Sequence, residues 1–452
     1  MKRSTRKKRL RGTLALALAL LTSACVWALV GTSTAAGDTP SLSPQVALDW
    51  NTLAVNAVRA ATTTDGVPAG LPARPMYQGE GLLYLGYVQA AVYDAVTKIE
   101  HRYRPYGKVD APAWNASPYS AVATAAYDTL TYFLGDPQGT LAAAYARTLT
   151  QLGDSGATRR GIAVGQAAAS DIEALRIDDG RDAATKTYGT PGAVKAGAWQ
   201  VVPPATYAQT PWLAFMKPLM LEKASQFRVP APPALTSAEY ARDFNETKAY
   251  GSLTSTVRTP QQTAIAYFWN ANVINQQNQL YRDVATQHGF DLVDTVRLLA
   301  MGNMTAADAS IACFDAKYDY LYWRPYTAIR NADLDGNAAT APDPTWTPLL
   351  ATPNHPEYPS AHGCITGATT DVIAHVLGTN EIDVTYWGAT NGGTALTTTQ
   401  HFATVADIQK QVADARVWAG LHWRFSTTAG ERIGNEVAHY VFEHYFQPVG
   451  SR

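Results

Sequence analysis

Residues 355–363 read HPEYPSAHG, and the interpretation of the whole chain starts from this stretch. Pro359 favours an extended approach, and Ser360 is a good N-cap for a helix that begins directly after it. Such a helix would offer free backbone N–H groups and the positive end of its dipole, which together bind anions. His362, in the first turn, would lie beside the anion with a pKa near neutrality, which suits proton transfer. Taken alone, the stretch fits an ordinary helix cap with a surface histidine equally well.

A second group of charged residues precedes it, where residues 317–325 read KYDYLYWRP. In one continuous helix, Lys317 and Arg324 would lie within about 20° around the axis and about 10 Å apart along it. Two long cations on one such stripe could close on a single anion. Pro325 disfavours helix at Arg324, so the arginine would sit at a helix end and could turn inward. For this stretch alone, a solvated Lys/Arg face lying over aromatic side chains is the favoured alternative.

A third group follows, where residues 415–426 read ARVWAGLHWRFS. Arg416 and His422 are six residues apart, so they cannot share one face of a continuous helix. Gly420 offers a helix stop, which would place Arg416 in the last turns of a helix and His422 in the turn beyond it. An arginine and a histidine at a helix end mean little by themselves.

In combination, the order Lys, Arg-Pro, Pro-Ser-x-His and Arg-x5-His resembles a specific family pattern. It is the pattern of the vanadium-dependent haloperoxidases and of the related metal-independent acid phosphatases, the type 2 phosphatidate phosphatase superfamily. Residues 233–240 and 258–269 and the sequence His422-Trp-Arg-Phe are also similar to bacterial haloperoxidases. The resemblance covers roughly residues 49–446 and is densest from Ser237 onward.

The resemblance implies a role for each residue of the three groups. The equatorial oxygens of vanadate would be bound by three cations, Lys317, Arg324 and Arg416. The Ser360 hydroxyl and the Ala361 backbone N–H would bind the same oxyanion, and phosphate could occupy the same site. The two catalytic residues would be His422, the axial vanadium ligand, and His362, the acid–base group for peroxide. His355 occupies a position linked with halide handling in the family.

The implied reaction is oxidation of a halide by hydrogen peroxide, which gives hypohalous acid or a halogenated small organic acceptor. Vanadate, at its highest oxidation state, would act as a Lewis acid, and no heme is implied. Burial of a multiply charged oxyanion is costly unless it is compensated. Three cations, a hydroxyl and a helix N-terminus would supply that compensation.

Two other functions stay open at this point. The same pocket could hydrolyse phosphoesters as an acid phosphatase, with His422 attacking phosphorus and His362 protonating the leaving alkoxide. The family usually has glycine at the position of Ala361, whose methyl group could crowd the oxyanion. It often has aspartate at the position of Ser426, where a carboxylate helps to orient the last histidine. A non-catalytic member that only binds oxyanions is therefore the third hypothesis.

The expected fold is all-α, with helical bundles packed together and the oxyanion site in the core of the C-terminal bundle, an arrangement that the resemblance implies. Apolar residues at three- and four-residue steps predict mostly helix. The expected helices are Val46–Ala60, Gly81–Ile99, Tyr119–Leu134, Thr140–Leu152, Arg159–Leu175, Ser237–Tyr250, Pro260–Gln279, Phe290–Leu299, Thr305–Trp323, Ala361–Leu377, Thr404–Gly420 and Ala429–Phe446. Residues 37–235 would form an N-terminal helical region that ends in a connection rich in proline and aromatic residues, about 188–235. Residues 236–452 would form the C-terminal bundle.

The first 36 residues are interpreted as an export signal. Seven cations in residues 1–12 precede an apolar run, Leu14–Val30, and a stretch of small residues. The apolar run has 17 residues, which is marginal for an uncleaved membrane anchor, the alternative interpretation. We therefore expect a secreted or extracytoplasmic protein without a stable membrane partner.

The composition of residues 37–452 argues against two further classes of protein. It has 29 cations against 37 acids, and this net charge of −8 argues against non-specific nucleic-acid binding. It retains only two cysteines, Cys313 and Cys364, which rules out a disulfide scaffold. One disulfide and two buried thiols are equally compatible with the sequence.

Overall fold

Helices dominate the part of the chain that the structure, a computed structural model, describes: residues 42–65, 67–181 and 193–450. The expected export signal, and residues 188–192 of the proline-rich connection, lie outside the described residues. The helices are α1 (Gln45–Ala60), α2 (Gln78–Glu100), α3 (Pro118–Leu134), α4 (Thr140–Leu152), α5 (Gly156–Arg176), α6 (Ala238–Gly251), α7 (Pro260–Phe268), α8 (Val273–Gln287), α9 (Leu292–Tyr320), α10 (Pro325–Arg330), α11 (Ala361–Leu377), α12 (Val405–Trp418) and α13 (Arg424–His444), with two short 3₁₀ turns, η1 (Pro211–Phe215) and η2 (Ala332–Leu334). Within these ranges, none of the helices combines the length and the apolar character needed to cross a bilayer.

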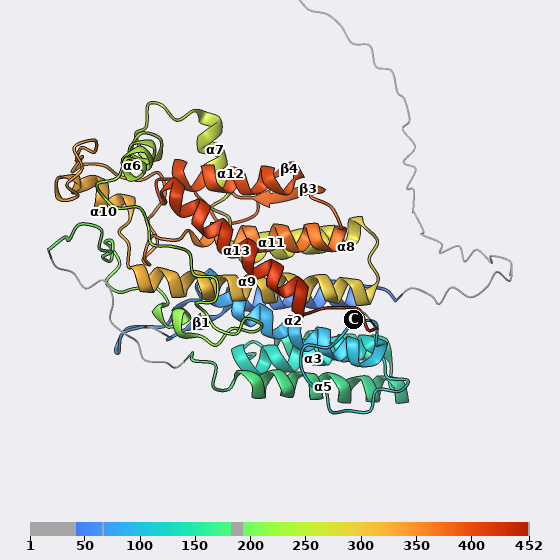
Figure 1. The fold of residues 1–452 in the computed structure, drawn as a ribbon. Coiled ribbons are helices and arrows are strands. Elements are labelled where there is room, and N and C mark those ends of the chain that lie inside the picture. Colours follow the sequence, from blue (N-terminus) through green and yellow to red (C-terminus); the bar gives the residue numbers. More distant parts are fainter. Residues whose placement is uncertain (1–41, 66, 182–192, 451–452) are drawn as a thin grey trace, which may run out of the picture. The chain divides into compact units, whose positions relative to one another are not determined.

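The long helix α9 lies between two groups of helices (Figure 1). On one side it packs along α2, which packs on α3, and α3 in turn packs on α5. On the other side it contacts α11 and α13, which pack closely on each other. The prediction of an all-α fold built from packed helical bundles is confirmed. The division of the chain near residue 236 stays a prediction.

The stretch predicted as one helix over Pro260–Gln279 is two helices, α7 and α8. The break follows from Asn272, whose side-chain oxygen accepts hydrogen bonds from the backbone N–H groups of Ile274 at 3.1 Å and Asn275 at 3.4 Å. An asparagine that caps the next helix in this way favours a new helix start over continuation.

In α9, two predicted helices are one: the separate helices expected at Phe290–Leu299 and Thr305–Trp323 form a single continuous helix. This helix is buried nearly all round, and its interior polar residue Asn303 is paired with Asn278 through an amide hydrogen bond of 3.0 Å. The helix ends at Tyr320, since Leu321 adopts a left-handed backbone with φ 47°. The predicted Lys317–Arg324 stripe on a single helix is therefore wrong: Arg324 is the N-cap of α10.

A β-hairpin was not predicted. Strands β3 (Glu381–Gly388) and β4 (Thr398–Thr404) pair antiparallel, with Val384 opposite Phe402. Alternate residues of β3 are buried, which is the ordinary pattern of a half-buried strand. Two-residue strands β1 (Thr62–Thr63) and β2 (Arg74–Pro75) form a second, minimal pair.

Small residues allow α11 and α13 to approach each other closely at the start of α11. A Cβ atom on Gly430 would lie 2.3 Å from the carbonyl oxygen of Ser360, and one on Gly434 would lie 2.2 Å from that of Cys364. Both distances are shorter than any ordinary contact, so side chains here would force the helices apart. Gly430 thereby allows α13 to pack directly against Ser360, the N-cap of α11, and Gly434 does the same at Cys364.

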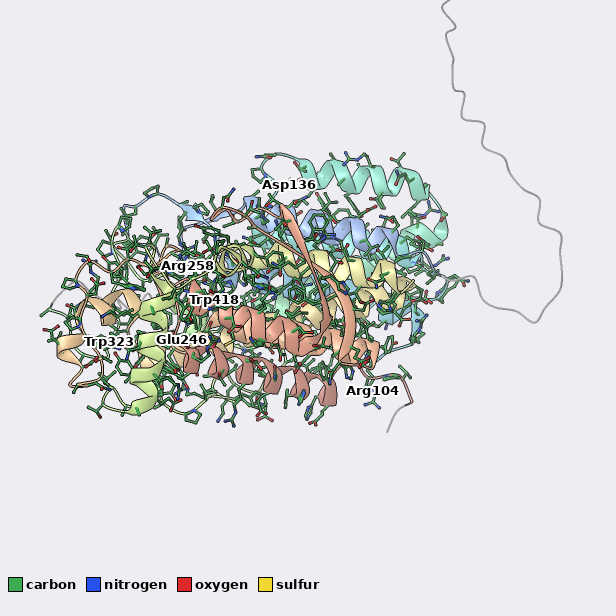
Figure 2. All side chains as sticks on the ribbon, turned by 90° about the horizontal axis from the view of Figure 1, so that it is seen from above. Arg104, Asp136, Glu246, Arg258, Trp323 and Trp418 are labelled. Carbon is green, nitrogen blue, oxygen red and sulfur yellow. The ribbon has the colours of Figure 1, made fainter. Side chains whose placement is uncertain are left out.

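Two arginines secure the end of the helix stack that carries the three sequence groups. Arg258 donates hydrogen bonds to the carbonyl oxygens of Ser252 at 2.7 Å and Trp418 at 3.3 Å, just beyond Arg416 in the chain. Arg424, two residues after His422, forms 2.6 Å ion pairs with Glu246 and Asp414. Figure 2 shows Glu246, Arg258, Trp323 and Trp418 at this same end.

Cys313 and Cys364 are both buried free thiols, so the structure has no disulfide between them. The Cys313 sulfur lies 3.8 Å from the carbonyl oxygen of Pro359, one turn of α9 before Lys317. The Cys313 thiol therefore packs against the end of the loop that precedes Ser360.

Candidate functional site

Lys317, in the last turn of α9, binds the loop that leads into α11. Its side chain is fully buried, and its ammonium group donates to the carbonyl oxygens of Pro356 and Glu357, both at 3.0 Å, and of Pro359. Burial lowers the pKa of Lys317 to about 8. Since an ammonium group has three donors, all three are committed to this loop. Lys317 thus shapes the loop and brings a positive charge to the site.

Arg324 connects this loop with the turn that carries His422. Its Nε donates to the carbonyl oxygen of His355 and its Nη1 to that of Leu421, both at 2.9 Å. Nη1 also lies 3.2 Å from Nε2 of His422, and Nη2 lies 3.0 Å from Nδ1 of His355. The guanidinium is completely buried, and burial lowers its pKa to about 10. Arg324 is therefore the central cation of the site, with one histidine on each side.

Ser360 precedes α11 as predicted, but its hydroxyl does not cap the helix. Its backbone N–H donates to the carbonyl oxygen of Ser426 at 3.0 Å, whereas its buried Oγ has no partner. Ala361 follows with 5% of its surface exposed and opens the first turn, whose N–H groups have no acceptor within the helix. The hydroxyl and the helix N-terminus are both available to an anion.

His362 and Arg416 share the backbone of Trp269. One ring nitrogen of His362 hydrogen-bonds to Trp269, and Arg416 Nη1 donates to the Trp269 carbonyl oxygen at 3.4 Å. The other nitrogen of His362, Nε2, is buried without a partner, and so is Nε of Arg416. Burial, together with Arg416, holds the pKa of His362 well below 6.5. Burial, together with Arg324, lowers the pKa of Arg416 to about 9.

His422 is held by a carboxylate that is not among the predicted site residues. Nδ1 of His422 lies 2.7 Å from Oε1 of Glu357, and the same oxygen accepts from the backbone N–H of Trp423 at 3.1 Å. Because Arg324 can only donate, Nε2 of His422 carries a lone pair and Nδ1 carries the hydrogen. Burial and the neighbouring Arg324 hold the pKa of His422 well below 6.5, so the ring is neutral.

Glu357 takes the place expected for an aspartate at position 426. Ser426 does not contact the His422 ring through any described hydrogen bond; its hydroxyl lies 3.4 Å from the carbonyl oxygen of Glu357. Glu357 is completely buried, and burial raises its pKa to about 7. Its position inside the HPEYPSAHG stretch was visible in the sequence, but nothing local indicated that it would face His422.

Tyr77, the residue before α2, also enters the site and was missed. Its hydroxyl lies 2.9 Å from Nε2 of His355, across 278 residues of sequence. The two rings pack with Phe314 of α9, at centroid distances of 6.1 Å from Tyr77 and 5.2 Å from His355. No signal in the sequence near residue 77 indicated this contact.

The arrangement fits a tetrahedral oxyanion such as vanadate or phosphate. Within the described part of the chain, buried polar atoms without a partner include Ser360 Oγ, His362 Nε2 and Arg416 Nε. Buried polar atoms are normally paired, so this group of unsatisfied atoms points to an absent ligand. Three buried cations against one carboxylate favour an anion, and the lone pair of His422 suits an electron-accepting centre.

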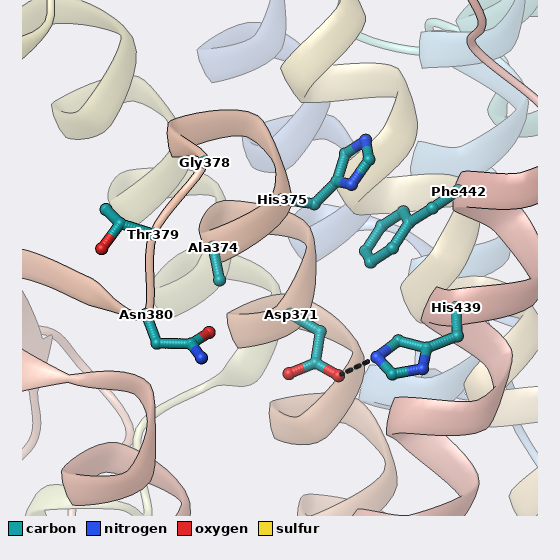
Figure 3. Close-up of a pocket in the computed structure, with 8 residues that line it drawn as sticks. All are labelled: Asp371, Ala374, His375, Gly378, Thr379, Asn380, His439 and Phe442. Atoms are coloured by element: carbon teal, nitrogen blue, oxygen red, sulfur yellow. Dashed lines mark ion pairs between the residues drawn. The ribbon is translucent and has the colours of Figure 1, made fainter.

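The structure also has open pockets away from this site. One of about 380 Å³ lies between α11 and α13, where Figure 3 shows the side chains that line it. Asp371 and His439 are 3.7 Å apart there, and the His375 ring stacks on Phe442 at 4.0 Å. These histidines are partnered residues at the surface, and the pocket has none of the buried cations of the oxyanion site.

Comparison with known proteins confirms the resemblance to the vanadium haloperoxidases. Residues 297–451, about a third of the chain, match the family model of the VCPO second helical-bundle domain. A vanadium chloroperoxidase from Curvularia inaequalis is 26% identical over 268 residues, which is 45% of this chain and 43% of that protein. The chain thus spans less than half the length of this curated relative.

Solved structures extend the similarity of the fold to most of the chain. A bacterial vanadium-dependent iodoperoxidase covers 92% of this chain and 99% of its own, with a TM-score of 0.73 and 19% identity. The apo form of a bacterial vanadium-dependent chloroperoxidase covers 82% of this chain and 95% of its own, with a TM-score of 0.64 and 18% identity. At these identities the likeness shows the fold alone.

Proposed function

We propose that this relative of the vanadium haloperoxidases oxidises a halide with hydrogen peroxide when vanadate occupies the oxyanion site. The observation that supports the proposal is the state of His422: its ring is neutral, Glu357 holds it through Nδ1, and Nε2 faces the buried Arg324. The products of the proposed reaction would be hypohalous acid or a halogenated small organic acceptor. Export through residues 1–36 belongs to the same proposal.

Each residue near the anion has a distinct task in this proposal. Arg324, Arg416 and the N–H groups at the start of α11 bind the oxyanion, with Ser360 as a hydroxyl donor. His422 would supply the lone pair of Nε2 to bound vanadate, and Lys317 contributes charge while it holds the loop. Vanadate, when bound, supplies a Lewis acid that makes peroxide reactive toward halide.

His362 handles the proton of hydrogen peroxide. Its pKa is held well below 6.5, so Nε2 is an unprotonated base at neutral pH. The hydrogen bond from its other ring nitrogen to the Trp269 backbone fixes the tautomer and the ring orientation. Nε2 can therefore accept a proton from incoming peroxide and return it to the product.

A metal-independent phosphatase is the second candidate, because an oriented, neutral His422 also suits nucleophilic attack on phosphorus. One observation weakens it: protonation of the leaving group would require a charged His362, and burial together with Arg416 holds the pKa of that ring well below 6.5. The third candidate is a member that binds oxyanions without turnover. It is favoured by the observation that all three N–H donors of Lys317 are already bonded to the loop before α11.

A paired assay distinguishes the three candidates. We expect protein from Gly37 onward to brominate a dione with hydrogen peroxide and bromide only after orthovanadate is added. Iodide and chloride are tested in the same format. Hydrolysis of a chromogenic phosphomonoester that vanadate inhibits, without halogenation, would establish the phosphatase instead. Activity in neither assay, with oxyanion binding intact, would leave the binding-only member.

Oxyanion binding is expected to stabilise the fold. A ligand that binds only the native state adds about 2.7 kcal/mol at a hundredfold excess over its Kd, which raises Tm by several degrees. Differential scanning calorimetry with phosphate or orthovanadate measures this rise, and a Ser360→Ala variant should reduce it. His444→Ala, at an exposed position on α13, is the matched control and should behave like the wild type.

A further inference from the structure

Cys313 and Cys364 meet where α9 packs against α11. Both thiols are fully buried, and they share a hydrogen bond with each other. Cys313 precedes Lys317 by one turn of α9. Cys364 follows Ser360 by one turn of α11, and its backbone N–H donates to the Ser360 carbonyl oxygen at 3.1 Å. The two sulfurs are therefore in contact between the two helices that carry Lys317 and Ser360.

The surroundings make the two thiols chemically unequal. Burial alone would raise the pKa of Cys313. The hydrogen bond from Cys364, together with the charges of Lys317 and Arg324, lowers it below its ordinary value. Burial, together with Cys313, raises the pKa of Cys364 well above 9.0. Because the thiolate and not the thiol is the nucleophile, Cys313 is the reactive member of the pair and Cys364 is its protonated neighbour.

Hydrogen peroxide oxidises such a pair in two steps. The Cys313 thiolate attacks one peroxide oxygen, the O–O bond breaks, and a sulfenic acid and hydroxide form. The sulfur of Cys364 then attacks the sulfenic sulfur, so an S–S bond forms while the S–O bond breaks, and the thiol proton leaves with the hydroxyl as water. In sum, two thiols lose two electrons and two protons to one peroxide, which becomes two water molecules.

We propose that Cys313 and Cys364 are a redox pair, which hydrogen peroxide converts reversibly into a disulfide between α9 and α11. Sulfurs that are already in contact need only a small shift to bond. Without a second thiol, further peroxide would convert the sulfenic acid into a sulfinic acid, which is irreversible. That charged group would lie against the Pro359 carbonyl oxygen, 3.8 Å from the Cys313 sulfur, which Lys317 also binds. Cys364 thus keeps oxidation beside the oxyanion site reversible.

Mass spectrometry of the full chain tests the proposal without halide or vanadate. The native protein is treated with excess hydrogen peroxide, the remaining thiols are alkylated in denaturant, and peptide mapping separates the pair from Cys25. We expect one cross-linked peptide that contains both cysteines, and dithiothreitol should restore both thiols. The proposal is overturned if both thiols stay reduced, if either is joined to Cys25, or if Cys313 of the wild type accumulates sulfinic acid.

Two serine variants separate the attacking thiol from the resolving one. Cys364→Ser keeps a hydrogen-bond donor beside Cys313, so dimedone should trap a sulfenic acid there, and longer exposure should give a sulfinic acid that dithiothreitol does not reverse. Cys313→Ser should leave Cys364 reduced, because its thiol stays buried and protonated. Circular dichroism checks that both variants fold. A Cys364→Ser protein that dithiothreitol fully restores would contradict the role of Cys364.

A cross-link between residues 313 and 364 should also stabilise the fold, because it closes a long loop in the unfolded chain. Oxidation should raise Tm of the wild type by several degrees and leave Tm of the serine variants unchanged. An unchanged or lower Tm of the cross-linked wild type would contradict a pair placed to form this bond. Failure of the haloperoxidase proposal is detected separately, since a chain that oxidises no halide can still form the disulfide with added peroxide.

Discussion

A His422→Ala variant is expected to lose more than about a hundredfold in affinity for vanadate, and with it all vanadate-dependent halide oxidation. Removal of residues that only orient a metal ligand costs 10- to about 100-fold, and loss of the ligand itself should cost more. The variant removes the lone pair of His422 Nε2, the donor to vanadate. Arg324 and Glu357 hold the imidazole ring that carries it. Equilibrium dialysis with vanadate and the bromination assay measure the two losses.

Controls for this variant must show that the site still folds. The backbone N–H of Trp423 still pairs with Glu357 in the variant, so circular dichroism and the melting curve should remain those of a folded protein. His375→Ala, in the surface pocket of Figure 3, is the matched histidine control. Vanadate affinity within a few-fold of wild type in His422→Ala would remove His422 as the axial ligand.

Residues whose role depends on a helix boundary could be predicted from the sequence. Ser360 does precede α11, and His362 lies in its first turn. Arg416 lies at the end of α12, and Gly420 follows that helix with φ 76°. Capping and termination depend on a few neighbouring residues, so local sequence is sufficient to locate them.

Contacts between distant segments could not be predicted in the same way. Glu357 meets His422 across 65 residues, and Tyr77 meets His355 across 278. The three carbonyl partners of Lys317 depend on the path of a loop with no regular pattern. The continuity of α9 likewise follows from burial on all sides, which local propensity does not contain.

Glu357→Gln is expected to remove a pH-dependent cost of folding. The pKa of Glu357 is raised from its ordinary value of 4.5 to about 7 because the carboxyl is buried. Between these values the folded state binds more protons than the unfolded state, so the free energy of unfolding falls as pH rises. The shift corresponds to about 3 kcal/mol of folding stability. This stability is fully present below pH 4.5, where the carboxyl is protonated in both states, and it is lost by about pH 7. Above pH 7 the glutamine variant should be the more stable protein by about this amount.

Denaturant unfolding of both proteins between pH 4 and pH 8 measures this difference, and Glu443→Gln, an exposed acid of α13, is the control. Parallel pH curves for wild type and Glu357→Gln would contradict the buried carboxylate as the source of the cost.

The same variant should bind vanadate 10- to about 100-fold more weakly, because an uncharged amide lowers the basicity of His422. Glu357 lowers the stability of the fold at neutral pH and raises the affinity for the oxyanion. Its presence is therefore explained by the function of the site and not by the stability of the fold. Glu357 therefore connects the two, since its ionisation costs folding energy in the same pH range in which it strengthens His422 as a ligand.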